Sequence, residues 1–380
     1  MDFKLSKSHE LQRELYRKFA EEQVAPLAEE MDETETFDMD LLNKMQKYGL
    51  MGIPYPQKYG GAGGDYLGYA LCMEEISAAD ASTGITISVH TSLACSCIFN
   101  YGSEEQKEKW LRPLIDGRKV GCFGLTEPNA GSDPAALQTK AVLDGDEYVI
   151  NGAKIFTTNS GFADTFVMFA MTDKSAGANG ISCFVVDKDT PGIHVGPNIK
   201  RMGIRAASNC EVSYENVRIP KENLIGKEGK GFKAAMKALD GGRIGVAAQS
   251  VGIAQGALNE AIKYVKERKQ YGKRISQFQN TQFKVAELQT AIDAARFLTW
   301  RAASAKDNHD HYGVHAAMAK LYSSKVANDV TRDCVQLMGG YGYSREYPVE
   351  RMMRDAKITE IYEGTSEIMK MVVSRSMNVG

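Results

Sequence analysis

The spacing of apolar residues changes twice along this 380-residue chain, and that change restricts the folds open to it. Up to about residue 115, apolar residues recur every three or four positions, as in Leu41, Leu42 and Met45, which predicts helices. From about residue 120 to about residue 220 the period becomes two, in runs such as EYVINGAKIFTTN, which predicts short strands. After Gly231 the helical period returns. Helices and strands are therefore segregated, unlike the alternating units of a dinucleotide-binding fold.

This segregation predicts an α+β multi-domain protein with three domains. We expect an N-terminal helical domain over residues 1–118, a middle domain of strands over 119–225 and a C-terminal bundle of long helices over 226–380. A compact barrel and a sandwich would both satisfy the short strands, and Asp144-Gly145 predicts a hairpin turn between two of them. A chain of this length can form two or three domains with a large buried core.

Composition and charge limit the classes of binding partner and the cellular location that we expect. Hydrophobic residues make up 43% and charged residues 25%, which is typical of a soluble globular protein, and the formal net charge is −2. Without an excess of Lys and Arg we expect no binding to nucleic acid. The N-terminal run MDFKLSKSHELQREL carries charges where a signal peptide has an apolar core, and no apolar run approaches membrane-spanning length. We therefore expect a cytoplasmic protein with no signal or transit peptide and no membrane insertion.

The cysteines and histidines suggest no reactive thiol and no metal site. The seven cysteines are odd in number and form no CxxC pair, so we expect buried, reduced thiols. The six histidines show no HExxH or paired-ligand spacing, and no serine lies in GxSxG. Metalloenzyme and hydrolase functions are therefore disfavoured.

Three polar clusters are the candidates for chemistry. The first, GLTEPNAGSDP at 124–134, follows a short strand and offers backbone N–H groups and hydroxyls to a ligand, although such a loop can also be purely structural. The second, QLMGGYGY at 336–343, has two adjacent glycines that let another backbone or a ligand approach closely, or that simply end a helix. Both alternatives remain open for each cluster.

The third cluster is IYEGTSEI at 361–368, which contains Glu363 just before a helix start at Thr365 and Ser366. The apolar neighbours Ile358 and Ile361 would desolvate the Glu363 carboxylate and raise its pKa toward neutrality, where it would act as a base. The alternative is a solvated loop glutamate.

The three clusters together, in this order around a middle domain of strands, resemble the acyl-CoA dehydrogenase family over essentially the whole chain. GLTEPNAGSDPAA at 124–136 and QLMGGYGYSREYPVERMMRD at 336–355 are similar to the two family signatures. The sequences LDGGRIGVAAQ at 239–249 and YEGTSE at 362–367 resemble those of the short-chain or butyryl-CoA branch. The resemblance implies a helical N-terminal domain, a middle β-barrel and a C-terminal four-helix bundle, assembled as a homotetramer that is a dimer of dimers.

The resemblance also implies FAD as the cofactor and names the residues that would contact it. The family often has Trp where Phe156 stands here, which would alter stacking on the flavin ring. Arg268 would reach the FAD of the neighbouring subunit, whereas the Lys-rich run around it alone would indicate a surface charge. The implied cofactor residues are Leu125, Thr126, Ser132, Phe156 and Thr158 near the ring, Arg268, Tyr271 and Gln279 toward a neighbouring subunit, Gln336, Gly339 and Gly340 on the pyrophosphate and adenosine side, and Thr365 and Glu367 beside the FAD.

The substrate implied by the resemblance is an acyl-CoA thioester, with Ser132, Phe232, Asp240, Arg243 and Gly364 beside it. Asp240 would accept a hydrogen bond from the pantetheine amide, and its spacing allows an ion pair with Arg243 or Lys237 equally well. Glu363 would remove the α-proton while the β-hydrogen leaves as hydride. Some family branches carry the base where this chain has Gly242, and a glycine cannot act as one.

The implied reaction is butyryl-CoA to crotonyl-CoA or its reverse, with electrons passed to or from an electron-transfer flavoprotein. Three alternatives stay open at the level of sequence: a dehydrogenase of branched or other acyl chains, an acyl-CoA oxidase, and a non-catalytic scaffold that inherited the fold. Acyl-CoA oxidases are usually much longer than this chain, and a family lyase would lack Glu363.

Overall fold

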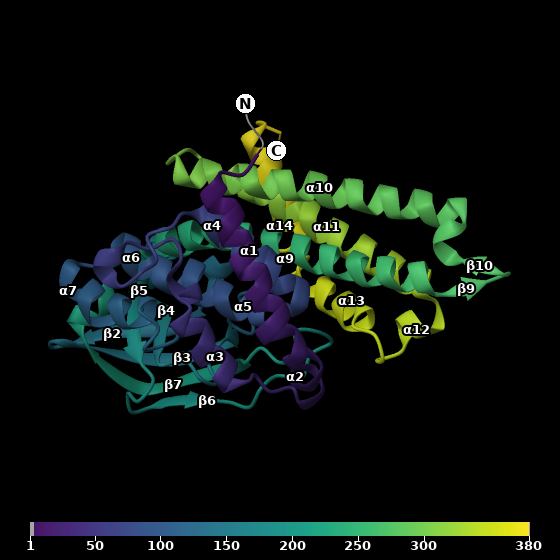
Figure 1. Ribbon diagram of the computed structural model, residues 1–380. Coiled ribbons are helices and arrows are strands. Elements are labelled where there is room, and N and C mark those ends of the chain that lie inside the picture. Colours follow the sequence, from purple (N-terminus) through teal and green to yellow (C-terminus); the bar gives the residue numbers. More distant parts are fainter. Residues whose placement is uncertain (1–3, 380) are drawn as a thin grey trace.

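The computed structural model describes residues 4–379 and has the predicted order of helices, strands and helices (Figure 1). Aspartates begin three of the N-terminal helices: Asp38 accepts a hydrogen bond from Leu41 N at 2.6 Å, Asp65 accepts one from Gly68 N at 2.7 Å and Asp80 accepts one from Thr83 N at 2.7 Å. The N-terminal helices are α1 (Lys7–Phe19), α2 (Ala28–Thr34), α3 (Met39–Lys47), α4 (Tyr66–Ala79), α5 (Ala81–Ser88), α6 (Ser96–Tyr101), α7 (Glu104–Gln106) and α8 (Arg112–Ile115).

Helices α5 and α6 are joined by a π-helical turn, and the combined segment Ala81–Tyr101 is long and apolar enough to cross a membrane. Our expectation that no apolar run approaches that length was wrong. Serines and threonines interrupt the apolar residues of this segment, so that it is not a continuous apolar run in the sequence. In the structure 94% of its most apolar window is buried inside the protein, where it contacts β1 and α9. The segment is thus accounted for as a core helix.

The strands of the middle segment form one eight-stranded sheet in the order β6-β7-β3-β2-β4-β5-β8, with β1 beside β4. The predicted hairpin lies between β2 and β3, where Asp144 pairs with Glu147, so that its loop is Gly145 and Asp146, one residue later than expected. The strands are β1 (Gly121–Gly124), β2 (Lys140–Asp144), β3 (Glu147–Thr158), β4 (Thr165–Met171), β5 (Ile181–Asp187), β6 (Ile193–Val195), β7 (Asn209–Pro220) and β8 (Leu224–Ile225).

The central strand β4 is buried on both of its faces. Phe166 and Met168 point into a core enclosed by the strands of the sheet, whereas Val167 and Phe169 pack in the large cluster shared with the helices. This double burial explains why the sequence of β4 is a continuous apolar run rather than an alternating one. The sheet is therefore fixed between its own interior and the helical domains.

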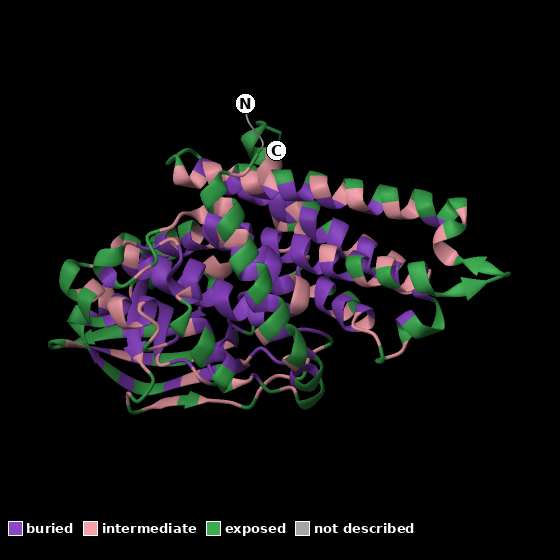
Figure 2. Cartoon of the chain, viewed as in Figure 1, coloured by how far each residue is buried: buried purple, intermediate pink, exposed green. Residues whose placement is uncertain are grey.

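The long helix α9 is the centre of the molecule, and most of it is buried (Figure 2). Its glycines permit close approach of α4: a Cβ at Gly252 or Gly256 would overlap the carbonyl oxygen of Glu74 or Ala78. Helices α10 and α11 lie alongside α9, and the small β9-β10 hairpin projects from the far end (Figure 1). The C-terminal elements are α9 (Gly231–Glu267), β9 (Lys269–Gln270), β10 (Lys273–Arg274), α10 (Gln279–Asp307), α11 (Gly313–Met338), α12 (Gly340–Tyr343), α13 (Val349–Ile358) and α14 (Ser366–Ser376).

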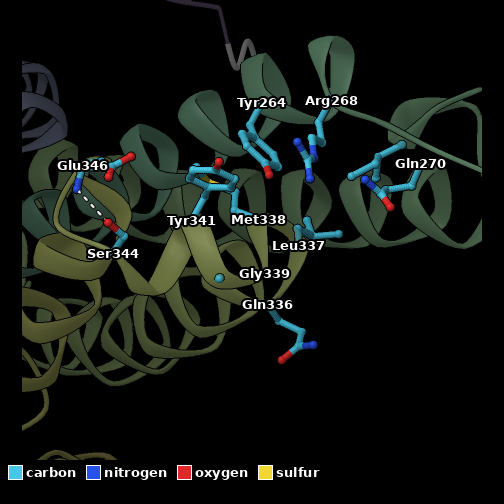
Figure 3. A pocket seen from close by; sticks show the side chains of 12 residues that line it. Tyr264, Arg268, Gln270, Gln336, Leu337, Met338, Gly339, Tyr341, Ser344 and Glu346 are labelled. Atoms are coloured by element: carbon cyan, nitrogen blue, oxygen red, sulfur yellow. Dashed lines mark hydrogen bonds between the residues drawn. The ribbon is translucent and has the colours of Figure 1, made fainter.

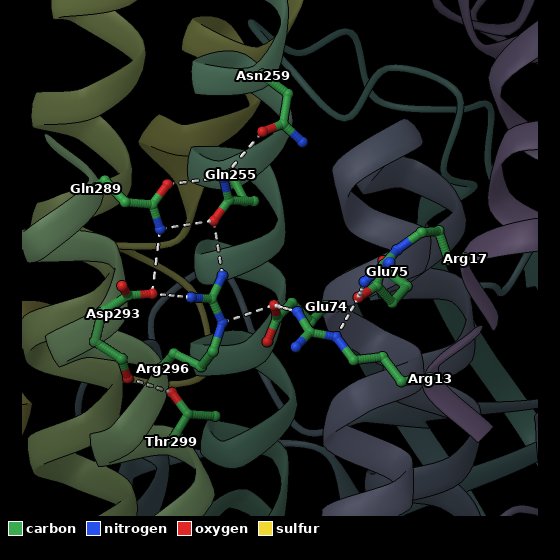
Figure 4. A network of polar contacts seen from close by, with 11 residues as sticks. Arg13, Arg17, Glu74, Glu75, Gln255, Asn259, Gln289, Asp293, Arg296 and Thr299 are labelled. Atoms are coloured by element: carbon green, nitrogen blue, oxygen red, sulfur yellow. Dashed lines mark hydrogen bonds and ion pairs between the residues drawn. The ribbon is translucent and has the colours of Figure 1, made fainter. Parts of the chain in front are cut away.

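A buried ionic network joins α1, α4 and α10 (Figure 4). The Glu74 carboxylate, with its side chain only 4% exposed, pairs with Arg13 at 2.6 Å and with Arg296 at 2.9 Å. Arg296 also pairs with Asp293 and donates to Gln255 on α9 at 2.8 Å. The N-terminal helices and the bundle are thus held together by charges that are satisfied only in the assembled fold.

Arg296→Met should destabilise the protein by about 3 kcal/mol, because it leaves the buried Glu74 carboxylate with Arg13 alone. The measurement is the urea unfolding midpoint followed by circular dichroism. Arg218→Met is the matched control, since its guanidinium is 52% exposed where it pairs with Asp144, and its midpoint should stay within error of the wild type. Equal shifts in the two variants would show that the buried network adds nothing.

Candidate active site

Glu363 occupies a tight loop between α13 and α14 whose backbone is unusual. Glu363 has φ 53° and Gly364 has φ 105°, so both lie in the left-handed region, which a non-glycine residue adopts at an energetic cost. Thr365 then begins α14, with its hydroxyl oxygen accepting from Ile368 N at 3.4 Å. The loop therefore presents Glu363 from a conformation that the surrounding contacts must enforce.

The Glu363 carboxylate is enclosed, and within residues 4–379 neither of its oxygens has a hydrogen-bond partner. Burial raises its pKa to about 7, and the positive charges of Arg243 and Lys320 oppose that rise. The Glu363 N–H is also without a protein acceptor in the described part of the chain. A buried carboxylate with a pKa near 7 is suited to accepting a proton from a bound molecule. The free N–H of the same residue can donate a hydrogen bond to that molecule.

Gly242 on α9 provides the space that this carboxylate occupies. A Cβ at position 242 would overlap Glu363 Oε2 and would lie 2.9 Å from Leu93 Cδ2. Any larger residue there would displace the carboxylate or the apolar wall beside it. The absence of a side chain at position 242 and the presence of Glu363 are therefore coupled features of one site.

Three of the four other residues expected beside the substrate on helical elements gather around Glu363. Arg243 donates from Nη1 to Asp240 Oδ1 at 2.7 Å and from Nε to the Glu363 carbonyl at 3.4 Å. Gly364 lies against the same guanidinium. Phe232 is further away, at the start of α9, where it packs on the large hydrophobic cluster that also contains Tyr362. Of the two roles weighed for Asp240, the ion pair with Arg243 is observed, and it uses Oδ1, so that Oδ2 can still accept from the pantetheine amide.

The loop after β1 lies beside the end of β3, which brings the predicted ring-contacting residues of the sheet together. Ile155 N donates to the Thr126 carbonyl at 2.9 Å, so Leu125 and Thr126 adjoin Phe156. Phe156 has φ 56° at an irregularity in the β3–β7 pairing and is 56% exposed. Thr158 accepts from Asn209 Nδ2 at 3.1 Å and is buried. Ser132, which was predicted to contact the ring together with these residues, lies on the exposed part of the loop after β1.

A buried ion pair that the sequence analysis did not identify anchors this loop. Lys154 on β3 is fully buried, and its Nζ donates to Glu127 Oε1 at 2.7 Å and to the Leu125 carbonyl at 3.3 Å. Glu127 also accepts from Gln138 N at 2.5 Å and Thr139 N at 3.0 Å. Burial lowers the pKa of Lys154 to about 8 despite the carboxylate. The signal was available, since Lys154 shares the inward phase of the alternation with Tyr148 and Ile150.

A surface pocket of about 500 Å³ unites four of the predicted cofactor residues, Arg268, Gln336, Gly339 and Gly340 (Figure 3). Arg268 ends α9 and lies 5.6 Å from the ring centre of Tyr341, and no carboxylate of residues 4–379 pairs with it. A Cβ at Gly339 or Gly340 would meet no atom of the described residues within 4 Å, so both glycines leave open space beside their backbone. Exposed backbone, an unpaired guanidinium and aromatic rings together are suited to a phosphorylated nucleotide.

The remaining predicted cofactor residues lie elsewhere on this single chain. Tyr271, 94% exposed with φ 52°, is at the tip of the β9-β10 hairpin, and Gln279 begins α10 on the exposed side. Thr365 and Glu367 line a second pocket of about 760 Å³ with Lys325 and Lys370. One chain therefore does not bring all of the predicted cofactor residues to one place.

Lys320 on α11 is a second site residue that the sequence analysis missed. It is fully buried, and its Nζ donates to the Gly364 carbonyl at 2.6 Å, directly after Glu363. Its position relative to the buried Ala316, Ala317 and Ala327 places a lysine on the buried stripe of a helix. That mismatch between residue type and period was the available signal.

Models of three domains of one family match this chain almost from end to end. The acyl-CoA dehydrogenase N-terminal domain matches residues 6–118, the middle domain residues 122–217 and the C-terminal domain residues 229–378.

Individual relatives are similar over nearly their full length. A protein of Clostridium acetobutylicum called "acyl-CoA dehydrogenase, short-chain specific" is 56% identical over 374 residues, which are 98% of this chain and 99% of the relative. The butyryl-CoA dehydrogenase structure from Megasphaera elsdenii has a TM-score of 0.98 at 46% identity and covers 100% of both chains. A chain in a structure described as the electron transferring flavoprotein of Acidaminococcus fermentans has a TM-score of 0.98 at 51% identity, over 99% of both chains.

Glu363→Gln should stabilise the protein more at high pH than at low pH. Because the pKa of Glu363 is raised from 4.5 to about 7 in the folded chain, its stability contribution is present below the unfolded pKa and is lost as pH rises through 7. The advantage of the variant should grow by about 2 kcal/mol between about pH 5 and about pH 8.5, measured as paired melting temperatures. Glu287→Gln, at an exposed carboxylate on α10, should show no such growth. A pH-independent offset for Glu363→Gln would contradict a dry carboxylate at this position.

Proposed function

The chain belongs to the acyl-CoA dehydrogenase family, and from this premise we propose that it is an FAD-dependent enzyme that dehydrogenates short-chain acyl-CoA thioesters across their α and β carbons. Butyryl-CoA to crotonyl-CoA is the reaction that the named relatives favour. The observation that carries the proposal is the buried carboxylate of Glu363, whose oxygens have neither a cation nor a hydrogen-bond donor bound to them among residues 4–379.

Glu363 is the base in this proposal. An α-proton of a thioester is weakly acidic, so its removal needs a base whose pKa is near the working pH and whose oxygens are not already hydrogen-bonded. Glu363 meets both conditions, with a pKa of about 7 and two oxygens available. The proton moves to one of these oxygens as negative charge develops on the thioester carbonyl oxygen.

The developing charge needs a donor placed near the base. The Glu363 N–H supports this role, since it has no acceptor among residues 4–379 and belongs to the same rigid loop as the carboxylate. Arg243 contributes by holding the loop through the Glu363 carbonyl. We place Asp240, Phe232 and Gly364 along the coenzyme A side of the site and Ser132 on the loop opposite.

The residues present fit FAD on two counts. Phe156, which is exposed near the end of β3, lies beside the loop that carries Thr126 and the buried Leu125, and next to Thr157, whose buried hydroxyl has no partner in the described chain. Gly339 and Gly340 leave backbone open beside Arg268 for a pyrophosphate. When bound, the flavin accepts the hydride that leaves the β-carbon.

We propose that the enzyme is a homotetramer, a dimer of dimers, in which FAD is shared between subunits. Tyr271 and Gln279 lie away from the ring-binding edge of their own chain, and the hairpin that carries Tyr271 projects from the molecule (Figure 1). In this assembly Arg268, Tyr271 and Gln279 would meet the FAD of a neighbouring subunit, and Thr365 and Glu367 would lie beside the FAD. Exposed apolar side chains on α10, such as Phe283 at 58%, are consistent with a covered face.

An electron-transfer flavoprotein is the proposed redox partner, because a chain 51% identical to this one occurs in a structure described by that name. The two electrons taken from the substrate would have to leave the enzyme before the next turnover, and such a partner would accept them. Electrons would flow to this partner during oxidation and from it during enoyl-CoA reduction.

We further propose a cytoplasmic location and the domain limits 1–118, 119–225 and 226–380. All seven cysteines are buried and free, as predicted, which is typical of proteins from a reducing compartment. The proposed limits fall close to the ends of the three family matches and in the segments between the helical and strand regions.

The test of the proposed function is a spectroscopic titration of the purified protein. The wild type should be yellow, and adding butyryl-CoA should bleach the flavin band; a longer straight-chain thioester should bleach it more slowly. Glu363→Gln should keep the bound flavin but lose dehydrogenation by about 10⁴-fold, since the base is removed without changing the size of the side chain.

Three results would contradict the proposal in different ways. Normal turnover by Glu363→Gln would refute the base, and rapid formation of hydrogen peroxide without an added acceptor would identify an oxidase. A colourless protein that ignores FAD would identify a scaffold.

Arg268→Met should weaken FAD binding about tenfold, because one charge-assisted contact to the pyrophosphate is lost. The measurement is flavin fluorescence during dilution or titration of the apoprotein. Lys266→Met, two residues earlier at the exposed end of the same helix, is the control and should bind FAD normally. Equal affinities for wild type and Arg268→Met would remove Arg268 from the cofactor site.

A further inference from the structure

Lys320 is a fully buried lysine that the proposed mechanism does not yet use. Its Nζ donates to the Gly364 carbonyl at 2.6 Å, and no carboxylate of residues 4–379 pairs with it. A buried ammonium without an ionic partner is costly to a fold. Its presence on the buried stripe of α11 therefore indicates a role beyond stability.

The acceptor of this hydrogen bond is the part of the backbone that sets the direction of Glu363. The carbonyls of the two left-handed residues each face a cation: Arg243 Nε lies 3.4 Å from the Glu363 oxygen, and Lys320 Nζ lies 2.6 Å from the Gly364 oxygen. The Lys320 contact is the shorter of the two. Strained backbone persists only where its surroundings over-determine it, and these contacts supply that determination.

We propose that Lys320 is a positioning residue for Glu363: its ammonium fixes the Gly364 carbonyl, and so the loop that aims the carboxylate, while its charge favours the ionised carboxylate. This inference rests on the proposed function of Glu363 as the base. In this proposal Lys320 touches neither substrate nor cofactor, and it acts on Glu363 through the loop.

The groups that face Glu363 come from three packed elements and its own loop: Arg243 from α9, Lys320 from α11, Tyr69 from α4, and Tyr362. Glu360 and Glu367 act on Lys320 in turn. Burial lowers the pKa of Lys320 to about 8, and the negative charge of Glu363 opposes that fall. Since burial raises the pKa of Glu363 and both cations oppose it, removal of the Lys320 charge moves that pKa further up.

The test compares Lys320→Met, Lys320→Gln and Lys320→Arg by the pH dependence of kcat/KM for butyryl-CoA. In Lys320→Met the acid limb should move up by about one pH unit, so that activity near neutrality falls about tenfold more than activity in alkaline solution. Lys320→Gln, which keeps a donor but no charge, should show the same shifted limb with a smaller loss at high pH. Lys320→Arg should keep the wild-type limb.

A second readout is independent of turnover. Infrared difference spectra across a pH titration report the protonated carboxyl of Glu363, identified by its absence in Glu363→Gln. The same upward shift should be seen in Lys320→Met and Lys320→Gln. Lys263→Met, at a 70% exposed lysine of α9, should leave the titration unchanged.

The outcomes separate the two proposals. An inactive wild type would overturn the proposed function, while the infrared titration would still test whether Lys320 acts on Glu363. A wild-type acid limb and an unshifted carboxyl titration in Lys320→Gln would overturn the positioning role, even where Lys320→Met fails to fold.

Discussion

A carboxylate in a dry interior is the constraint on which the rest of this site depends. Burial raises the pKa of Glu363 to about 7, and a fold that tolerates this must supply both space and compensating charge. The space comes from Gly242, and the charge comes from Arg243 and Lys320. Neither cation bonds to the carboxylate. Both instead bond to main-chain carbonyls of its loop, which keeps the charges close and the two carboxylate oxygens available for a proton. A direct ion pair would have lowered the pKa and occupied the oxygens, and so removed the basicity that a proton abstraction needs.

Helix α9 connects this carboxylate to the rest of the molecule. It carries Asp240, Gly242 and Arg243 at the site, and further along it Gln249, which accepts from the Tyr362 hydroxyl and donates to the Ala81 carbonyl at 2.8 Å. Its C-terminal end places Arg268 at the surface pocket. One buried helix thus runs from the surroundings of the proposed base to the proposed pyrophosphate site. The close approach of α4 at Gly252 adds the N-terminal domain to the same rigid unit.

Local patterns in the sequence were sufficient for the order of the helical and strand regions and for the desolvation of Glu363, and insufficient for the residues that act on Glu363 from a distance. The alternation of apolar residues identified the strands because one phase of each is buried, and the apolar neighbours of Glu363 correctly suggested its desolvation. Lys320 lies 44 positions before its acceptor, and Lys154 lies 27 positions after its partner Glu127, so neither pairing leaves a trace within a window of a few turns. The hairpin loop was displaced by one residue, because β2 and β3 pair as far as Asp144 and Glu147. For Tyr271 and Gln279 the limit is different, since a single chain does not contain the surface that they are expected to meet.

The two proposed halves of the reaction site are built by the same physical device. On the sheet, buried Lys154 donates to the Leu125 carbonyl, and the neighbouring Phe156 has φ 56°; on the helices, buried Lys320 donates to the Gly364 carbonyl, and the neighbouring Glu363 has φ 53°. A left-handed conformation costs a non-glycine residue about 1 to 2 kcal/mol, and a buried ammonium costs more, so a fold selected for stability alone would keep neither. Phe156 lies at an irregularity of strand β3 and Glu363 lies in a loop, and at both places a buried lysine donates to a nearby main-chain carbonyl. In the proposed enzyme, the position of the ring-contacting residues relative to the base would depend on these two lysines and their hydrogen bonds to main-chain oxygens, so an apolar residue of similar size at either position should loosen the site.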